Sequence, residues 1–299
     1  MAGPRLIVNP PAFTPSPYGL LSVAQQVNTD GTPHWQNGVT WQTRCLVPMG
    51  RSTYDECIVV TGSGGAPPEP ATKTDMVDLG YRGSTPFTPY AKFDCSLSGM
   101  EDALKIATDA LAQSESWQVE RAFWTGFIDG RQVVFPHLAA TADVLDAQSI
   151  KLQSAASIVV TGSAVDVATG LGLLESALAD CYNGVGVIHV PVKLLPTLQA
   201  YSLVTSQNGK LRTLNGNLVA AGGGYPGTSP SGAAPTAGES WMYATGAVFM
   251  YRGDVQIPSD KVSSINRTTN TREMIAERTY VLGWDCCHHA VLVDLGVPI

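Results

Sequence analysis

The feature that most constrains this chain is one long helical signal in a sequence that otherwise shows strand and turn patterns. Ser98 and Glu101 form a capping box, and Gly126 supplies a C-terminal stop. At about 1.5 Å per residue, a helix over this range is about 40 Å long. The apolar face is expected to contain Met100, Ala103, Leu104, Ala107, Leu111, Val119, Ala122 and Phe123, and the other face Lys105, Asp109, Gln113, Glu120 and Arg121. The pattern predicts a spine against which other elements pack.

The second half of the sequence mixes helices with strands. A second helix is predicted from about Ala164 to Tyr182, capped by Ser163 and ended by Asn183-Gly184. A strand over 186–190, a short helix over 194–201 and a hairpin around Asn208-Gly209 follow, and a loop of small residues and prolines occupies 222–238. Closing strands are predicted over 242–252 and 279–295. The fold class is therefore α+β with a mixed sheet.

The first third of the chain lacks the pattern of a packed unit. Residues 1–45 are rich in proline and contain Trp35 and Trp41 without helical or alternating periodicity, which predicts an extended arm. Residues 46–97 hold a glycine- and proline-rich stretch, then a strand-like alternation over 86–93. We interpret this range as a long, open hairpin.

Charge is scarce in this sequence. Only 14% of the 299 residues are charged, where about 25% is typical of soluble domains. The net charge of −7 argues against a chain-wide nucleic-acid or membrane-surface binder, and no apolar run reaches about 18 residues. The N-terminus has no secretory pattern, which predicts cytosolic synthesis. The low content of charged residues has two possible explanations. Either the source proteome is generally rich in Ala, Gly and Thr, or much of the surface contacts other subunits, since the cores of protein interfaces contain few charged residues.

The cysteines are predicted to be free thiols, mostly small buried hydrophobes, because no export signal accompanies them. They are Cys45, Cys57, Cys95, Cys181, Cys286 and Cys287. The run from Cys286 to His289 resembles a metal cluster, yet at most one cysteine and one histidine share a face of a strand. With no Cys-x-x-Cys elsewhere, we expect a core strand and no metal site.

Catalytic and cofactor motifs are unconvincing. Ser63 lies in a segment similar to the nucleophile segment of trypsin-like proteases, but glycine precedes it and no triad context is recognisable. Gly222, Gly224 and Gly227 match a dinucleotide pattern, although nearby prolines forbid the helix that it needs. We expect no enzymatic activity and no cofactor, and a hydrolase using Ser63 is the alternative from another class.

Four segments, taken in order, resemble the coat proteins of tailed bacteriophages of the Hong Kong 97 type, a fold that encapsulins share. Residues 120–126 are similar to the end of that family's spine helix. Residues 186–191 and 213–219 look like its central strand and the hairpin before a glycine loop, and 276–281 resembles its closing strands. The resemblance covers nearly the whole chain.

The resemblance implies an N-terminal arm over 1–45, an extended loop over 46–97, a peripheral domain with the spine helix over 98–160 and 255–299, and an axial domain over 161–254. The implied function is that of a major capsid protein. It would self-assemble into pentamers and hexamers of an icosahedral phage head around double-stranded DNA, in the host cytoplasm. The alternative is an encapsulin-like nanocompartment shell. Implied partners are a portal, a separate scaffolding protein, cement proteins and non-specifically held DNA, with no membrane.

Two sets of contact residues follow from this resemblance. The arm and extended loop are expected to bury their apolar side chains on the next subunit, namely Trp35, Trp41, Tyr54 and Phe87. Some relatives cross-link a lysine of the extended loop to a neighbour's asparagine, with a carboxylate as base. The matching residue types here are Lys73, Asn266 or Asn270, and Glu277, although such residues are ordinary in surface loops.

Overall fold

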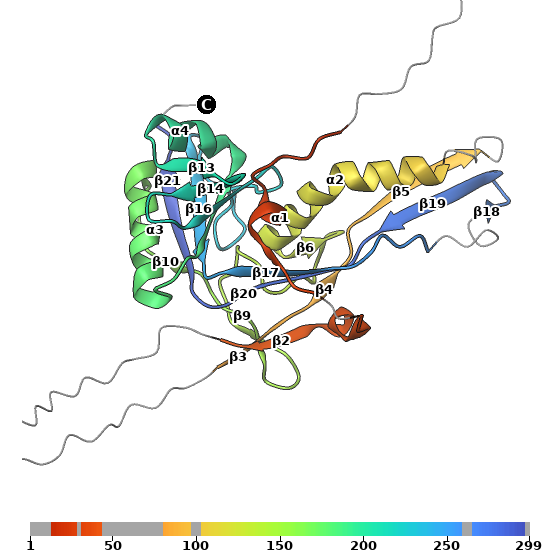
Figure 1. Cartoon of the computed structure of the whole chain (residues 1–299), viewed down its shortest axis with the longest axis horizontal. Helices are drawn as coiled ribbons and strands as arrows, with labels where there is room; N and C mark the ends of the chain where they lie inside the picture. The colour runs from red at the N-terminus through yellow and green to blue at the C-terminus, as the bar shows by residue number, and fades with distance from the viewer. Residues whose placement is uncertain (1–12, 29–30, 44–79, 97–102, 259–264, 297–299) are drawn as a thin grey trace, which may run out of the picture.

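The computed structural model describes residues 13–28, 31–43, 80–96, 103–258 and 265–296. One end of the molecule is a broad sheet covered by helix α3 (Val167–Cys181), and helix α2 (Ala103–Thr125) runs from the centre into a long projection (Figure 1). A smaller sheet lies below the centre in this view. The mixture of helices and strands agrees with the predicted α+β class.

The broad sheet has eight strands, in the order β10-β21-β16-β12-β15-β14-β13, with β11 also paired to β21. Its core forms where the apolar side chains of the strands pack against the buried face of α3. The buried residues of that face recur at helical spacing and are Val167, Leu171, Leu174 and Leu178. The strands are β10 Ser157–Ile158, β11 Val165–Asp166, β12 Val187–Pro191, β13 Val204–Gln207, β14 Lys210–Thr213, β15 Leu218–Gly222, β16 Glu239–Thr245 and β21 His288–Asp294. The short helices η3 (Val192–Leu194) and α4 (Leu195–Ala200) follow β12.

The projection consists of the first half of α2 packed on a ribbon of β5 (Tyr90–Ser96), β19 (Thr271–Glu277) and β18 (Ile265–Asn266). Ala103, Ala107 and Leu111 face the ribbon at four-residue steps and pack with Met274 and Ala276. Small residues there let the helix approach the strands closely. The helix ends where predicted, because Gly126 adopts φ +78°. The predicted capping box at its start, Ser98 and Glu101, lies outside the described residues.

The second half of α2 enters the central core. Phe123 packs edge-on against Trp284 with ring centroids 5.5 Å apart, and Trp124 packs against Tyr243 at 4.8 Å. A four-stranded sheet closes this core in the order β1-β17-β20-β4. Its strands are β1 Gln25–Gln26, β17 Val248–Arg252, β20 Tyr280–Trp284 and β4 Pro86–Phe87.

The remaining elements are short. A second four-stranded sheet has the order β2-β3-β9-β8, formed by β2 Val39–Gln42, β3 Tyr81–Ser84, β9 Lys151–Gln153 and β8 Val144–Leu145. β6 (Phe127–Ile128) and β7 (Arg131–Gln132) make a hairpin after α2, and α1 (Leu20–Val23) and η1 (Pro33–Asn37) lie near the N-terminus. No helix of the described residues is long and apolar enough to cross a membrane.

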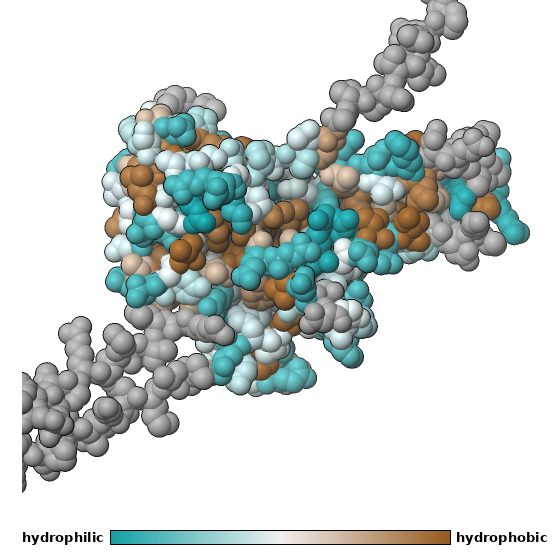
Figure 2. Space-filling view, in the orientation of Figure 1, coloured by the Kyte–Doolittle hydropathy of each residue, from teal (hydrophilic) through white to brown (hydrophobic). Residues whose placement is uncertain are grey.

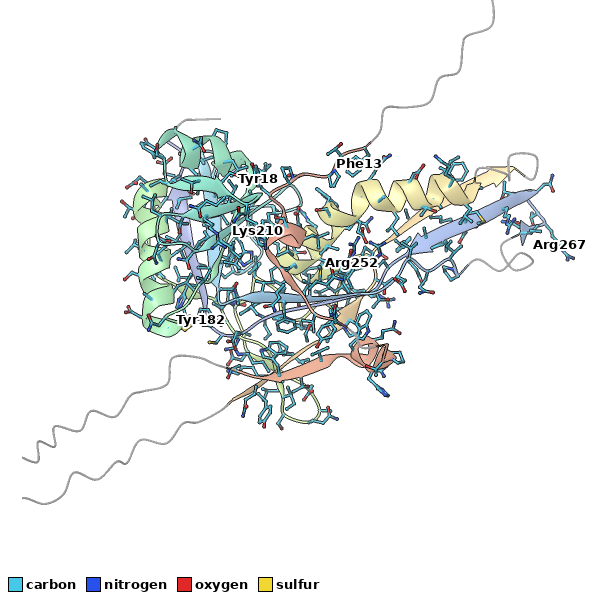
Figure 3. The ribbon with its side chains drawn as sticks, in the orientation of Figure 1. Phe13, Tyr18, Tyr182, Lys210, Arg252 and Arg267 are labelled. Carbon is cyan, nitrogen blue, oxygen red and sulfur yellow. A yellow bond between two sulfur atoms is a disulfide. The ribbon has the colours of Figure 1, made fainter. Side chains whose placement is uncertain are left out.

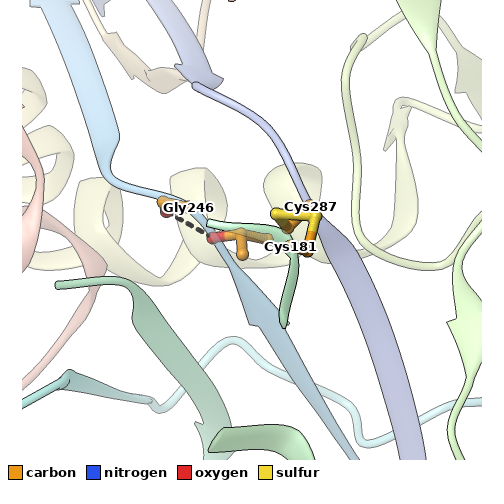
Figure 4. Close-up of a disulfide and its surroundings, with 4 residues drawn as sticks. Cys181, Gly246 and Cys287 are labelled. Carbon is orange, nitrogen blue, oxygen red and sulfur yellow. Dashed lines mark hydrogen bonds between the residues drawn. A yellow bond between two sulfur atoms is a disulfide. The ribbon is translucent and has the colours of Figure 1, made fainter. Parts of the chain in front are cut away.

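Several predictions of element boundaries are corrected. Asp166, not Ser163, caps α3, because its carboxylate accepts a hydrogen bond from the Thr169 amide at 2.9 Å. The expected closing strands are each divided in two. The chain changes sheet at Gly246, whose amide donates to the Cys286 carbonyl at 2.7 Å, and again just before β21 (Figure 4).

The pairings of these strands connect the segments 161–254 and 255–299, whose division into axial and peripheral domains stays a prediction. β21, expected in the segment 255–299 of a peripheral domain, pairs with β16 in the broad sheet. β17, expected in the axial segment 161–254, pairs with β20 in the central sheet. The first break falls at Gly246 and the second at residues 285–287, and the alternation of residues alone does not reveal either break.

The prediction of free thiols is wrong for one pair. Cys181, at the end of α3, forms a disulfide with Cys287, with the Cα atoms 5.9 Å apart (Figure 4). Cys286 is buried and lies outside this disulfide. Cys287 has φ +65° and lies in the link between β20 and β21, so the run from Cys286 to His289 is not one continuous strand.

Candidate assembly surface

The N-terminal segment and the glycine-rich loop meet on one buried carboxylate of α2. Glu120 Oε1 accepts hydrogen bonds from the Leu20 amide at 3.0 Å and from Ser116 Oγ at 3.3 Å. Glu120 Oε2 accepts one from the Gly224 amide at 2.9 Å. Burial raises the pKa of the Glu120 carboxyl above its ordinary value. The prediction that Glu120 faces solvent is therefore wrong, since it satisfies backbone donors of two other segments.

Two glycines permit this close approach. A Cβ on Gly224 would lie 2.2 Å from the Trp117 carbonyl oxygen, and one on Gly19 would lie 2.3 Å from Glu120 Oε1. The loop over 222–238 is tied down further along, because Trp124 Nε1 donates to Thr228 Oγ1 at 3.0 Å and the Tyr243 hydroxyl donates to the Thr228 carbonyl at 3.0 Å. The spine helix thus fixes both the loop and the entry of the N-terminal segment.

A second buried carboxylate lies one and a half turns earlier on α2. Glu115 receives both a hydrogen bond of 2.5 Å from the Tyr280 hydroxyl and ion pairs with Arg278 at 2.8 Å and Arg252 at 3.0 Å. Burial and the Glu115 carboxylate raise the pKa of Tyr280. One carboxylate faces two guanidinium groups, so the cluster carries a net positive charge. It joins α2 to β17 and to the turn before β20.

A groove of about 630 Å³, here called the α2 groove, opens beside this cluster. The groove is lined by residues of the N-terminal segment between 13 and 22 and by residues of α2 between 108 and 116. Arg252, Val255 and Arg278 complete the lining. Figure 3 labels Phe13 and Arg252 in this region. Phe13 is 47% exposed there.

Large apolar side chains are exposed at two places that suit contact with other chains. On α2, Leu104, Ile106 and Trp117 are exposed, and Figure 2 shows apolar patches over the projection that contains this helix. Beyond α4 and β14, Tyr201 is 66% exposed and Leu214 is 79% exposed. These two are the most exposed large hydrophobic side chains in the described residues. Apolar groups left in water favour association.

The predicted contact residues find partners within their own chain. Trp35 is buried and stacks on Tyr251 at 5.9 Å, and Trp41 packs edge-on against Phe249 at 4.8 Å. Phe87 is buried in the central core. Trp35 and Phe87 are thus buried within their own chain and Trp41 is partly buried, and contact of these residues with a neighbouring subunit stays a prediction. The described part of the expected arm, 13–28 and 31–43, packs on the sheets through β1 and β2. Tyr54 lies outside the described residues.

Among the described residues considered for a cross-link, the two asparagines lie far from the glutamate. Asn266 and Asn270 lie at the outer tip of the projection, where Figure 3 labels Arg267, and Asn266 Oδ1 accepts hydrogen bonds from the Thr268 and Thr269 amides. Glu277 lies at the other end of β19, about 20 Å away at the rise of an extended strand. Lys73 and Ser63 lie outside the described residues. The predicted cross-link therefore stays a prediction.

Sequence patterns missed Glu115 and Glu120 as buried acids. Glutamate in a helix is read as a solvent-facing residue, and the partners of both residues are distant in sequence. A weak signal was available, since both glutamates lie on the helix faces that carry Leu111, Val119 and Trp124.

No protein family model matches the sequence, and no curated relative matches it. Solved structures do match nearly the whole chain. The capsid of an empty GTA particle aligns with a TM-score of 0.57 and 12% identity over 98% of this chain and 95% of that one. Structures of Microbacterium phage Oxtober96 and Mycobacterium phage Ogopogo align with TM-scores of 0.52, at 13% and 9% identity. They cover 97% of this chain, and 95% and 97% of theirs.

Identities this low carry information about the fold and not about detailed contacts. The match extends over the long helix, the broad sheet and the projecting ribbon, because almost all of both chains is aligned. The resemblance stated from the sequence is confirmed at this level: the chain has a phage major capsid protein-like fold.

Proposed function

We propose that this chain is the major capsid protein of a phage head, a structural subunit without enzymatic activity that assembles into pentamers and hexamers around double-stranded DNA. The observation that carries the proposal is the fold match to a GTA capsid over 98% of this chain and 95% of that one. The alignment covers nearly the whole length of both chains, so the likeness concerns the entire fold and not one part of it.

The surface supports the proposal. Exposed Leu104 and Ile106 lie on the projection, Trp117 is exposed in the second half of α2, and Tyr201 and Leu214 lie on the broad domain. Two separate apolar regions on one subunit allow it to contact more than one neighbour, as a closed shell requires. Weak contacts repeated many times then add up. The low charged content of the chain agrees with such coverage.

The test is assembly of the full-length protein, examined by cryo-electron microscopy. Closed shells with five- and six-fold capsomers are expected, in the virion and after assembly with a scaffolding protein. A protein that stays monomeric under those conditions would contradict the proposal. Shells that enclose DNA distinguish a phage head from an encapsulin-like compartment, which would instead enclose protein cargo.

The apolar residues of the broad domain provide a matched pair of variants. Leu214→Asp places a charge where a neighbouring subunit is expected, so assembly should fall at least tenfold while the thermal transition of the subunit stays within a few degrees. Asn208→Asp adds the same charge at an exposed position in the turn of the β13–β14 hairpin, at the opposite end of β14 from Leu214. This control should assemble normally, and equal assembly by both variants would place the contact elsewhere.

Partners and the covalent cross-link belong to the same proposal. A portal, a separate scaffolding protein and cement proteins are expected as partners of the shell. The net charge of −7 agrees with DNA that is enclosed by the shell without being bound tightly to it. A cross-link through Lys73 would give ladders in boiled SDS gels. A single band at 31.6 kDa would exclude it.

A further inference from the structure

Three potential metal ligands meet where α3 ends against the link between β20 and β21. Cys181 Sγ, Cys287 Sγ and a ring nitrogen of His289 all lie within 4.8 Å of one another. Cys287 and His289 are two residues apart in the sequence, while Cys181 lies at the end of a helix 106 residues before Cys287. Sequence spacing had hidden this third ligand, since it belongs to no Cys-x-x-Cys pair.

The histidine of this cluster has an unusual environment. His289 Nε2 is buried and has no hydrogen-bond partner among the described residues. Buried polar atoms are almost always paired, so an unpartnered nitrogen on a ring that lies beside two sulfurs calls for an explanation.

We propose that Cys181, Cys287 and His289 form a binding site for a thiophilic divalent cation such as Zn²⁺ when the disulfide is reduced. A dithiol reductant supplies two electrons and two protons, is itself oxidised to a disulfide, and leaves two thiols on the chain. Binding of the cation then releases both thiol protons and forms two metal–thiolate bonds and one metal–imidazole bond. Disulfide and metal are therefore alternative states of one site.

Geometry and ligand chemistry agree with a tetrahedral centre. With Zn–S distances of about 2.3 Å and Zn–N distances of about 2.0 Å, tetrahedral ligand atoms lie about 3.5–4 Å apart. Breaking the S–S bond lets the sulfurs separate to that distance by side-chain rotation. Cys181 and His289 are half-buried, so water can reach the fourth position. Two cysteines, one histidine and water form a known zinc ligand set.

The experiment uses the full-length protein, reduced with a phosphine and titrated with Co²⁺, whose thiolate complexes absorb in the near ultraviolet. The reduced protein should bind one equivalent with a thiolate-to-metal charge-transfer band that Zn²⁺ abolishes. The oxidised protein should show no band. These readouts do not depend on whether shells form.

Variants assign the band to this site. Cys181→Ser should abolish the band, and His289→Gln should weaken binding at least tenfold. Cys286→Ser is the matched control, because this buried neighbour is not among the three ligands. Absence of a band in the reduced protein, or the same band in Cys181→Ser, would overturn the proposal. If Cys181→Ser fails to fold, His289→Gln keeps the test, and unchanged affinity in that variant counts against the site.

Discussion

The Arg278 guanidinium is held against both oxygens of the Glu115 carboxylate, with Nη1 lying 2.8 Å from Oε1 and 3.0 Å from Oε2. Glu115 comes from the middle of α2, and Arg278 comes from the turn between β19 and β20. The pair therefore joins the spine helix to the chain that leads from the projection into the central core. Arg252 adds a second positive charge to the same carboxylate from β17.

Removing the charge of Glu115 should be strongly destabilising. In Glu115→Gln, two guanidinium groups remain close together without a carboxylate, and breaking a buried ion pair costs about 3 kcal/mol or more. We expect the melting temperature to fall by about 6 °C or more, measured by scanning calorimetry. Asp109→Asn removes the exposed Lys105–Asp109 pair on the same helix and should change stability by less than about 0.5 kcal/mol. Equal effects in the two variants would refute a structural role for the buried pair.

A methyl group at Gly224 should displace the glycine-rich loop. Its Cβ would lie 2.2 Å from the Trp117 carbonyl oxygen and 2.9 Å from the Arg121 amide, and helix backbone cannot move aside cheaply. Gly224→Ala should therefore lose the Glu120 hydrogen bond and destabilise the protein by about 2 kcal/mol. Gly223→Ala is the control, since nothing lies within 4 Å of the point that its added Cβ would occupy. Proteolysis within residues 222–238, followed by mass spectrometry, should accelerate only in Gly224→Ala.

Local rules predicted the elements whose signals lie within one segment. The end of α2 at Gly126 and the turn at Asn208-Gly209 follow from residues that tolerate a left-handed backbone, and both are present. The buried face of α3 follows from leucine spacing. The loop over 222–238 follows from its glycines and prolines. These features depend on neighbours within a few residues, which a sequence displays directly.

Features that depend on distant partners could not be predicted. Glu120 is buried because Leu20 and Gly224, about 100 residues away on either side, present amides to it. Cys181 meets Cys287 only because α3 covers β21. Trp35 stacks on Tyr251 of β17, so a tryptophan in a segment without periodicity can be buried within its own chain and does not require contact with another subunit. Pairings of this kind require the topology of the sheets.

Acid should destabilise the protein through a histidine in its core. His189 is fully buried, and burial lowers its pKa to about 3. Thr245 Oγ1 donates to the Gly246 carbonyl, so His189 Nε2 donates to Thr245 and Nδ1 accepts from the Tyr225 hydroxyl. A proton on Nδ1 would remove the acceptor of Tyr225 and place a charge in the core.

The sign of this effect follows from proton linkage. Below about pH 6.5 the unfolded chain binds a proton at His189, whereas the folded chain binds it only near pH 3. As the pH falls through this window, the free energy of unfolding therefore decreases by up to about 1.4 kcal/mol per pH unit. His189→Gln should flatten the slope of unfolding free energy against pH between pH 6 and 4, measured by urea titration. His34→Gln, which alters an exposed histidine, should leave the slope unchanged. Parallel slopes in wild type and His189→Gln would contradict this prediction.

Reduction of Cys181–Cys287 should lower the stability of the isolated subunit by several kcal/mol. The bond closes a loop with a sequence separation of 106 residues, and the loss of chain entropy in the unfolded state predicts about 4–5 kcal/mol for a loop of that length. At about 2 °C per kcal/mol for a chain of this size, the melting temperature should fall by roughly 8–10 °C. The measurement compares oxidised and phosphine-reduced protein in the presence of a metal chelator, so that no cation can bridge the two sulfurs.

Cys286→Ser should keep the full shift, because Cys286 is outside the bond. Cys181→Ser should melt at the lower temperature with or without reductant, and a reductant-sensitive transition in that variant would show that another pair of cysteines is responsible.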